Sequence, residues 1–248
     1  MGPLLTANAK PRSPHLMISK RILAALLMAG WSWYLLLAGV VHGQESAAGP
    51  WGFVRLLNAV SEGTGKLDFI IDGKNVRPAG YQLGNTTGGI ALAPQTHSIV
   101  FRREGVREGG TQVVVTANDT TILIPFAEQV PASPDQPARW EIRILRLKQY
   151  AVEDQRTATF VSVAPAPEIK VEIRQADATW EPVVVKRLGI ARAIIKQAHG
   201  YMSVRCNERP LAAVSVGATG NFVSVLYHDA QGVLCSTTFQ DYKYLSAD

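Results

Sequence analysis

The stretch that most constrains the fold of this chain is residues 53–72, which read FVRLLNAVSEGTGKLDFIID. Two apolar runs flank the turn-forming segment SEGTG. In the second run Leu67, Phe69 and Ile71 alternate with polar residues, so an extended strand would place all three on one face. The dipeptide Asp72-Gly73 follows and suits a two-residue turn, because glycine readily adopts positive φ. The stretch therefore predicts a β-hairpin unit.

The rest of the chain after residue 50 continues as short β-type runs separated by Gly, Pro and Asn, with no convincing helical period. This pattern is typical of an all-β sandwich or barrel. Residues 130–137 contain three prolines and predict a connector or a long exposed loop. Residues 140–147 return to strand character, and the polar residues 148–156 are read as a short helix or a linker.

A second series of β-type runs, in the later part of the chain, repeats the order of the first. The run EIKVEIR at 168–174 takes the place of KLDFIID at 66–72, and further runs recur at a nearly constant offset of about 100 residues. We therefore predict two tandem immunoglobulin-like antiparallel β-sandwiches, residues 50–150 and 155–248, related by internal duplication. The alternative is that any two β-domains share short strands and turns.

Residues 1–43 have the features of a signal peptide. Lys20-Arg21 precede an apolar run at 22–41, and small residues at its exit favour cleavage before Gln44. Met17 is an alternative start, which would make the preceding tract an over-extension. The rival interpretation is an uncleaved membrane anchor, since about 20 apolar residues can span a bilayer. In both cases we expect the remainder outside the cytoplasm, in the periplasm or secreted.

The formal charge of +5 comes mostly from this leader. Removing Lys10, Arg12, Lys20 and Arg21 from the 25 Lys and Arg leaves the rest nearly balanced against the 20 Asp and Glu. A nearly neutral mature chain lacks the basic footprint of a nucleic-acid-binding protein, so DNA and RNA are not expected partners.

The opening segment resembles two related groups of exported β-sandwich domains. Val54-Arg55-Leu56-Leu57-Asn58-Ala59 followed by LDFIIDG at 67–73 is similar to the opening of DUF4397 domains. The same opening, with a Pro/Gly-containing bend before the next strand, resembles the periplasmic alginate O-acetylation accessory protein family. That resemblance implies a signal peptide and two sandwiches in tandem. It also implies an accessory or adaptor protein for exopolysaccharide O-acetylation or cell-surface assembly, with periplasmic or membrane proteins as partners. The Pro-rich stretch 129–139 and the cysteine pair depart from the family.

Signals for catalysis are scarce in the sequence. Outside the leader, His97, His199 and His228 lie in no metal-ligand spacing, and we expect them at strand ends on the surface. No G-x-S-x-G elbow is present. Asp68 and Asp72 share a strand face, where they either bind Ca²⁺ or are solvated carboxylates. We predict no catalytic residue, no cofactor and no metal site. The alternative is a polysaccharide-active enzyme with its site in the loops at a sandwich end.

One basic stretch is a candidate contact surface for a partner or an anionic polysaccharide, and it contains Lys186, Arg187, Arg192 and Lys196. Arg102, Arg103 and Arg107 occupy the corresponding part of the first repeat. The alternative is ordinary exposed charge, balanced by Glu104, Glu108 and Glu181.

Cys206 and Cys235 are the only two cysteines. In an oxidising compartment such a pair normally forms a disulfide, so we predict a bridge worth about 3–4 kcal/mol. A redox role is not expected, because no C-x-x-C motif is present.

Overall fold

The computed structural model describes residues 50–150, 155–176, 178–217, 220–241 and 244–247. The described chain is all-β, as predicted, and Gly49–Asp248 form one compact unit. The proposed signal peptide lies outside the described residues. The described residues include no helical segment with the length and hydrophobicity that a membrane span requires.

The first half of this unit forms one sheet that folds over on itself. Its strand order is β3-β2-β5-β6-β8-β7-β1-β4, and β6 and β8 pair at Arg107 and Glu141. We call β3-β2-β5-β6 the first outer sheet and β8-β7-β1-β4 the first inner sheet. Between them lies a core that includes Phe69, Phe101 and Leu123. The strands are β1 (Gly52–Leu56), β2 (Thr64–Ile71), β3 (Lys74–Asn75), β4 (Ile90–Leu92), β5 (Thr96–Glu104), β6 (Val106–Val114), β7 (Thr120–Val130) and β8 (Arg139–Tyr150).

The second half forms two sheets that enclose a core of their own. The second inner sheet has the order β12-β9-β16-β17, and the second outer sheet has the order β11-β10-β13-β14, with β15 also on β13. A last strand, β18 (Tyr244–Ala247), returns to pair antiparallel with β8. The strands are β9 (Thr157–Ser162), β10 (Glu168–Gln175), β11 (Glu181–Lys186), β12 (Ile190–Ile194), β13 (Gly200–Cys206), β14 (Arg209–Pro210), β15 (Val214–Val216), β16 (Asn221–His228) and β17 (Leu234–Asp241).

The strand pairing of the first inner sheet recurs in the second. β1 is parallel to β7 and antiparallel to β4, while β9 is parallel to β16 and antiparallel to β12. Each parallel partner then pairs antiparallel with the strand that follows it, β8 or β17. The two inner sheets therefore share one strand order and one set of strand directions.

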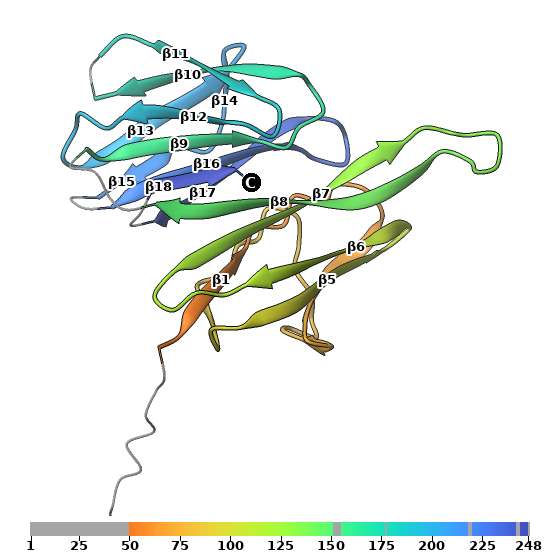
Figure 1. Ribbon diagram of the computed structural model, residues 1–248. Coiled ribbons are helices and arrows are strands. Elements are labelled where there is room, and N and C mark those ends of the chain that lie inside the picture. The colour runs from red at the N-terminus through yellow and green to blue at the C-terminus, as the bar shows by residue number, and fades with distance from the viewer. Residues whose placement is uncertain (1–49, 151–154, 177, 218–219, 242–243, 248) are drawn as a thin grey trace, which may run out of the picture. The chain divides into compact units, whose positions relative to one another are not determined.

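A third core lies between the two inner sheets (Figure 1). Ile122 and Ile124 of β7 point into this middle core with Val223 and Val225 of β16, whereas Leu123 points into the first core. The central strands are thus buried on both faces, which accounts for the continuous apolar run ILIPF in β7 and for the absence of charged residues from β9.

The hairpin predicted across residues 53–72 does not form, because β1 pairs with β4 and β7 whereas β2 pairs with β3 and β5. The alternating strand and the turn after it are confirmed. Leu67, Phe69 and Ile71 are buried, and the ring of Phe69 stacks on Phe101 with 5.0 Å between centroids. Asp72 and Gly73 have φ values of 48° and 78° and connect Ile71 to its pairing partner Lys74. Two consecutive positive φ values define a type I′ turn, whose twist matches that of the strands.

The Pro-rich stretch 130–137 is not a connector between the halves. It is the exposed end of the β7–β8 hairpin, in which Val130 pairs with Arg139. The long-exposed-loop interpretation of this stretch is therefore the correct one. Residues 148–150 belong to β8, and residues 151–154 lie outside the described residues.

Candidate docking site

The β7–β8 hairpin extends beyond the strands that flank it. β7 pairs with β1 from Thr120 to Leu123 and has one further bridge, Phe126 with Ala59. Beyond Phe126, β7 pairs only with β8 within the described residues. We call residues 127–140 the arm. The arm projects to the right in Figure 1.

The end of the arm is closed by a second tight turn. Ser133 and Gln136 exchange backbone hydrogen bonds of 2.8 and 3.2 Å across Pro134-Asp135. Pro131 and Pro137 flank this turn and have no N–H to offer to an added strand. Prolines on exposed edges oppose sheet extension between molecules, so the arm is suited to contacts through its side chains.

Glu141 anchors the base of the arm. Its side chain is only 11% exposed and accepts hydrogen bonds of 2.9 Å from both Arg139 and Arg107. Arg143 lies 3.3 Å away on its other oxygen. The hydrogen bond from Arg139, helped by Arg107, lowers the pKa of Glu141 although burial opposes the shift. Glu141 therefore stays ionised, and its carboxylate holds the guanidinium groups of these three arginines together.

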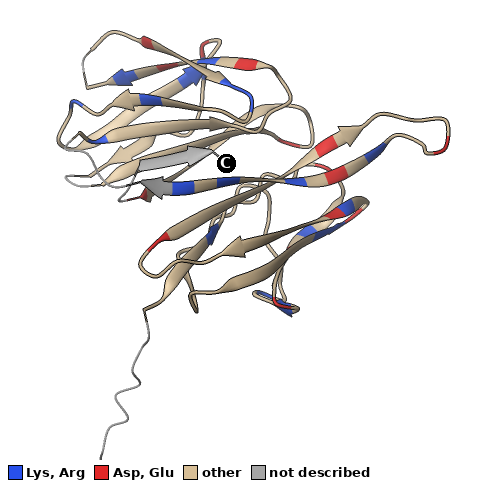
Figure 2. Cartoon of the chain, viewed as in Figure 1, with Lys and Arg blue, Asp and Glu red and all other residues tan. Residues whose placement is uncertain are grey.

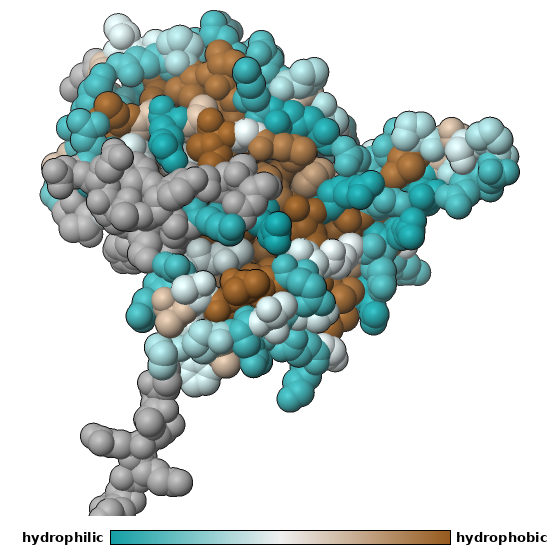
Figure 3. Space-filling model, viewed as in Figure 1, coloured by the Kyte–Doolittle hydropathy of each residue, from teal (hydrophilic) through white to brown (hydrophobic). Residues whose placement is uncertain are grey.

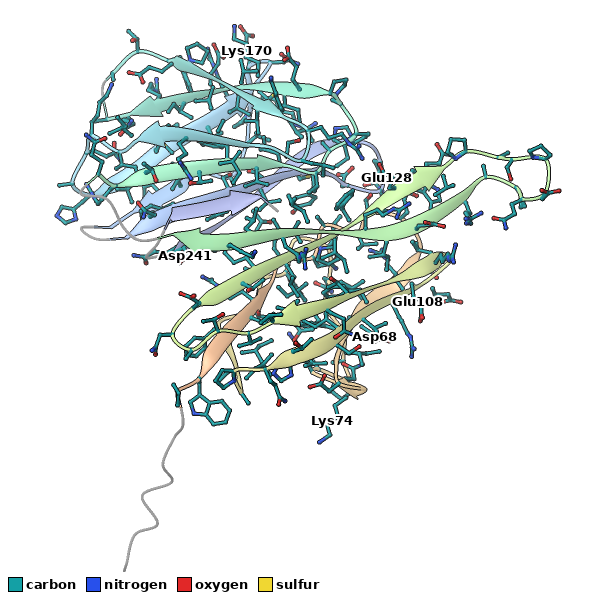
Figure 4. The ribbon with its side chains drawn as sticks, viewed as in Figure 1. Asp68, Lys74, Glu108, Glu128, Lys170 and Asp241 are labelled. Atoms are coloured by element: carbon teal, nitrogen blue, oxygen red, sulfur yellow. The ribbon has the colours of Figure 1, made fainter. Side chains whose placement is uncertain are left out.

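Glu128 ties the arm to the second half. Its carboxylate accepts a 2.7 Å hydrogen bond from Arg187, in the turn between β11 and β12, and lies 3.5 Å from Arg143 of β8. Figure 4 shows Glu128 at the base of the arm, and Figure 2 shows the alternation of basic and acidic residues along this part of β8. The ion pairs thus fix the direction in which the arm leaves the sheets.

The predicted basic stretch does not form a single patch. Arg187 is engaged with Glu128, and Lys196 donates a 2.9 Å hydrogen bond to Glu181. Glu181 begins β11 whereas Lys186 ends it, so the two ends of the stretch are about 17 Å apart along the strand. Arg192 lies exposed on β12. Of the four residues, the structure brings only Arg187 to the arm.

The three arginines singled out in the first half also have separate roles. Arg102 pairs with Glu108 at 2.7 Å, and Arg103 donates to the backbone carbonyls of Val60 and Gly63. Arg107 joins the base of the arm through Glu141.

Two hollows flank the base of the arm. A groove of about 790 Å³ lies between β6 and β8, with Gly109 and Gly110 among its lining residues. A pocket of about 440 Å³ includes Trp140 of the arm and both Tyr227 and His228 of the second half. Figure 3 shows hydrophobic atoms interspersed with hydrophilic ones around this region. Hollows of mixed polarity beside a projecting element offer a partner both apolar and charged contacts.

The structure corrects the expectation for His97, which is buried and not on the surface. Its Nδ1 lies 2.6 Å from Asp72 Oδ2, and its Nε2 donates to the carbonyl of Ala93 at 2.9 Å. Burial alone would lower the pKa of His97, but the hydrogen bonds to Ala93 and Asp72 outweigh it and raise that pKa. His199 is exposed and His228 is half-buried, as expected for residues at strand ends.

The carboxylates considered for Ca²⁺ have protein partners. Asp72 accepts hydrogen bonds from His97 and from the Ser98 amide, and Asp68 accepts one from Asn75. The His97 hydrogen bond lowers the pKa of Asp72. No group of three or more His, Cys, Asp or Glu in the described part of the chain could hold a metal ion.

The disulfide predicted between Cys206 and Cys235 is wrong: both are free thiols in the structure. Cys206 packs against the core of the second half, whereas Cys235 packs against the middle core. Cys206 belongs to β13 of the second outer sheet and Cys235 to β17 of the second inner sheet, so the second inner sheet separates the two side chains. Burial raises the pKa of both thiols, so neither is activated as a nucleophile.

The arm itself was not predicted, although the sequence contained a signal for it. Two long strand-forming runs flank the Pro-rich stretch directly, an arrangement that fits a hairpin better than a linker.

Comparison of the chain with models of known protein families and with curated protein sequences finds no match.

Proposed function

We propose that this chain is an exported, non-catalytic accessory protein that docks a partner protein through the arm. The observation that carries the proposal is the arm itself, a projecting hairpin braced at its base by Glu128 and Glu141. Bracing reduces the conformational entropy that a docking element would lose on binding, which favours association. Its prolines leave the side chains of the arm as the contact surface.

The pathway follows from the resemblance of residues 53–73. It supports a location in the periplasm or among secreted proteins, and a role as an adaptor in exopolysaccharide O-acetylation or cell-surface assembly. The partner is then a periplasmic or membrane protein of a polysaccharide-modification complex, such as a membrane-bound O-acyltransferase. The protein would hold no cofactor and turn over no substrate alone.

We also infer that the two halves are immunoglobulin-like sandwiches that arose by internal duplication. The recurrence of strand order and direction in the two inner sheets supports this inference, together with the sequence offset of about 100 residues. The arm is then a feature of the first repeat, because β16 and β17 are joined by a shorter loop.

Shortening the arm tests the docking function. Residues 131–138 are replaced by Asn-Gly, which joins Val130 to its pairing partner Arg139 through a two-residue turn. We expect the variant to keep the melting temperature of the parent, because all replaced residues are exposed. It should no longer co-purify with the proposed partner, a membrane-bound O-acyltransferase expressed together with it. Lys74→Ala, an exposed change on the first outer sheet, is the matched control and should leave co-purification intact.

Two outcomes would contradict the proposal. Co-purification that survives the shortened arm would remove the arm from the function. Robust esterase or acetyltransferase activity of the purified protein alone would favour the enzyme with a site in its loops, and the pocket beside Trp140 and His228 would be the first place to examine.

A further inference from the structure

The outward face of the second outer sheet combines aromatic and cationic side chains. Strand alternation points Ile169, Val171 and Ile173 of β10 into the core and the residues between them outward. We call this surface the Trp180 face and define it by Lys170, Arg174, Trp180, Val184, Tyr201 and Arg205. Lys170 points away from the sheet at the top of Figure 4.

Trp180 lies against two guanidinium groups on this face. The Cζ atom of Arg205 is 4.0 Å from the indole centroid, and that of Arg174 is 4.9 Å away. Glu172 accepts a 2.7 Å hydrogen bond from Arg205 Nε, which fixes the guanidinium plane. Cation–π contact and this hydrogen bond therefore hold two bidentate donors beside one half-buried aromatic ring.

Large apolar side chains continue the surface away from Trp180. Tyr201 is 70% exposed and Val184 is 50% exposed, although both lie within strands. Tyr201 precedes Arg205 by four residues on the same face, about 13 Å along β13. An exposed tyrosine offers a flat apolar surface with a polar end, a combination common in contact surfaces.

The first outer sheet provides an internal comparison. Asp68 of β2 lies opposite Arg102 of β5, just as Glu172 of β10 lies opposite Arg205 of β13. The outward positions of the described strands β2, β5 and β6 hold no aromatic residue. Between the outward faces of the two outer sheets, as far as their strands are described, only the second combines aromatic and cationic side chains, whereas the opposed pair of charges occurs on both.

We propose that the Trp180 face binds a polysaccharide built from carboxylated sugars. The apolar faces of the sugar rings would lie on Trp180 and Tyr201, and their carboxylates would accept paired hydrogen bonds from Arg174 and Arg205. Lys170 adds positive charge for the repeating negative charge of the polymer. This site is separate from the arm and goes beyond the docking function proposed above.

The test is calorimetric titration of the full mature chain with polygalacturonate oligomers. We expect binding to the parent, and an affinity about tenfold lower for Tyr201→Ser and for Arg205→Gln. Arg102→Gln is the matched control on the first outer sheet and should bind like the parent. Because Tyr201 is largely exposed, its variant should remain folded even if Arg205→Gln does not.

Three results would overturn the proposal. The first is no binding of polygalacturonate by the parent. The second is an equal loss of affinity for Arg102→Gln, which would indicate unspecific attraction. The third is equal binding of neutral dextran, which would exclude recognition of carboxylates. None of these results affects the shortened-arm experiment, so failure of the glycan site and failure of the docking function are distinguishable.

Discussion

Replacing Gly84 with alanine tests how the two halves are joined. Gly84 belongs to a first-half loop, and its carbonyl accepts a hydrogen bond from Thr237, whose hydroxyl is in turn 2.9 Å from that of Tyr227. A Cβ atom on Gly84 would lie 2.5 Å from the Tyr227 hydroxyl oxygen and 3.2 Å from Thr237 Oγ1. Tyr227 is buried in the middle core and its ring cannot retreat freely.

Gly73 is a matched control for this substitution. Both glycines have φ of +78°, but a Cβ atom on Gly73 meets nothing within 4 Å. The left-handed conformation should cost alanine about 1–2 kcal/mol at either position. Gly84→Ala should lose about 1–2 kcal/mol more, from overpacking and from the disturbed Tyr227–Thr237 hydrogen bond. The expected loss is thus about 2–4 kcal/mol for Gly84→Ala.

Urea unfolding of the two variants measures this difference. Adding Tyr227→Phe removes the nearer of the two atoms that the new methyl group meets, so in that background the loss caused by Gly84→Ala should fall towards that of Gly73→Ala. Equal losses for the two single variants would refute the packing of the halves through the middle core.

Three further predictions concern titration, thiols and export. His97, whose pKa is raised in the folded state, stabilises the fold fully at pH values below its ordinary pKa of 6.5, and this stabilisation is lost as the pH rises through the folded pKa. Asp72, whose pKa is lowered in the folded state, stabilises the fold at pH values above its ordinary pKa of 3.8. The stability lost in His97→Gln should therefore be largest between these pH values and shrink in alkaline buffer; a loss independent of pH would argue against the ion pair. Cys206 and Cys235 should both be alkylated after denaturation without reductant, and protection of either would indicate a bridge. Intact-mass analysis of exported protein should find Gln44 at the N-terminus, and retention of residues 22–43 would indicate the anchor.

Local patterns in the sequence predicted the parts of the fold that depend on neighbours in the chain. Alternation at Leu67, Phe69 and Ile71 identified a strand with one buried face, and Asp72-Gly73 identified its turn. Both features depend on backbone geometry within a few residues, and the order of neighbouring residues is enough to predict that geometry. The all-β class follows from the same patterns.

Features that depend on stacking of sheets could not be predicted in this way. Cys206 and Cys235 both lie in β-strands, and only the order of layers places their side chains in different cores, separated by the second inner sheet. The sequence around His97 predicts a surface residue at a strand end, but in the folded chain Asp72 and the Ala93 carbonyl contact its ring. The candidate sites depend equally on distant residues, since Arg187 meets Glu128 and Trp180 meets Arg205 only in the folded chain.

We propose that this protein acts by binding through defined surfaces and not by turnover. Hydrogen–deuterium exchange of the mature chain with saturating polygalacturonate tests this most directly, when the length of the polymer is followed in the same sample. We predict protection confined to β10, β11 and β13, around Trp180, with no shortening of the polymer. Shortening of the polymer would contradict the absence of turnover, and protection located elsewhere in the molecule would contradict the Trp180 face as the binding surface.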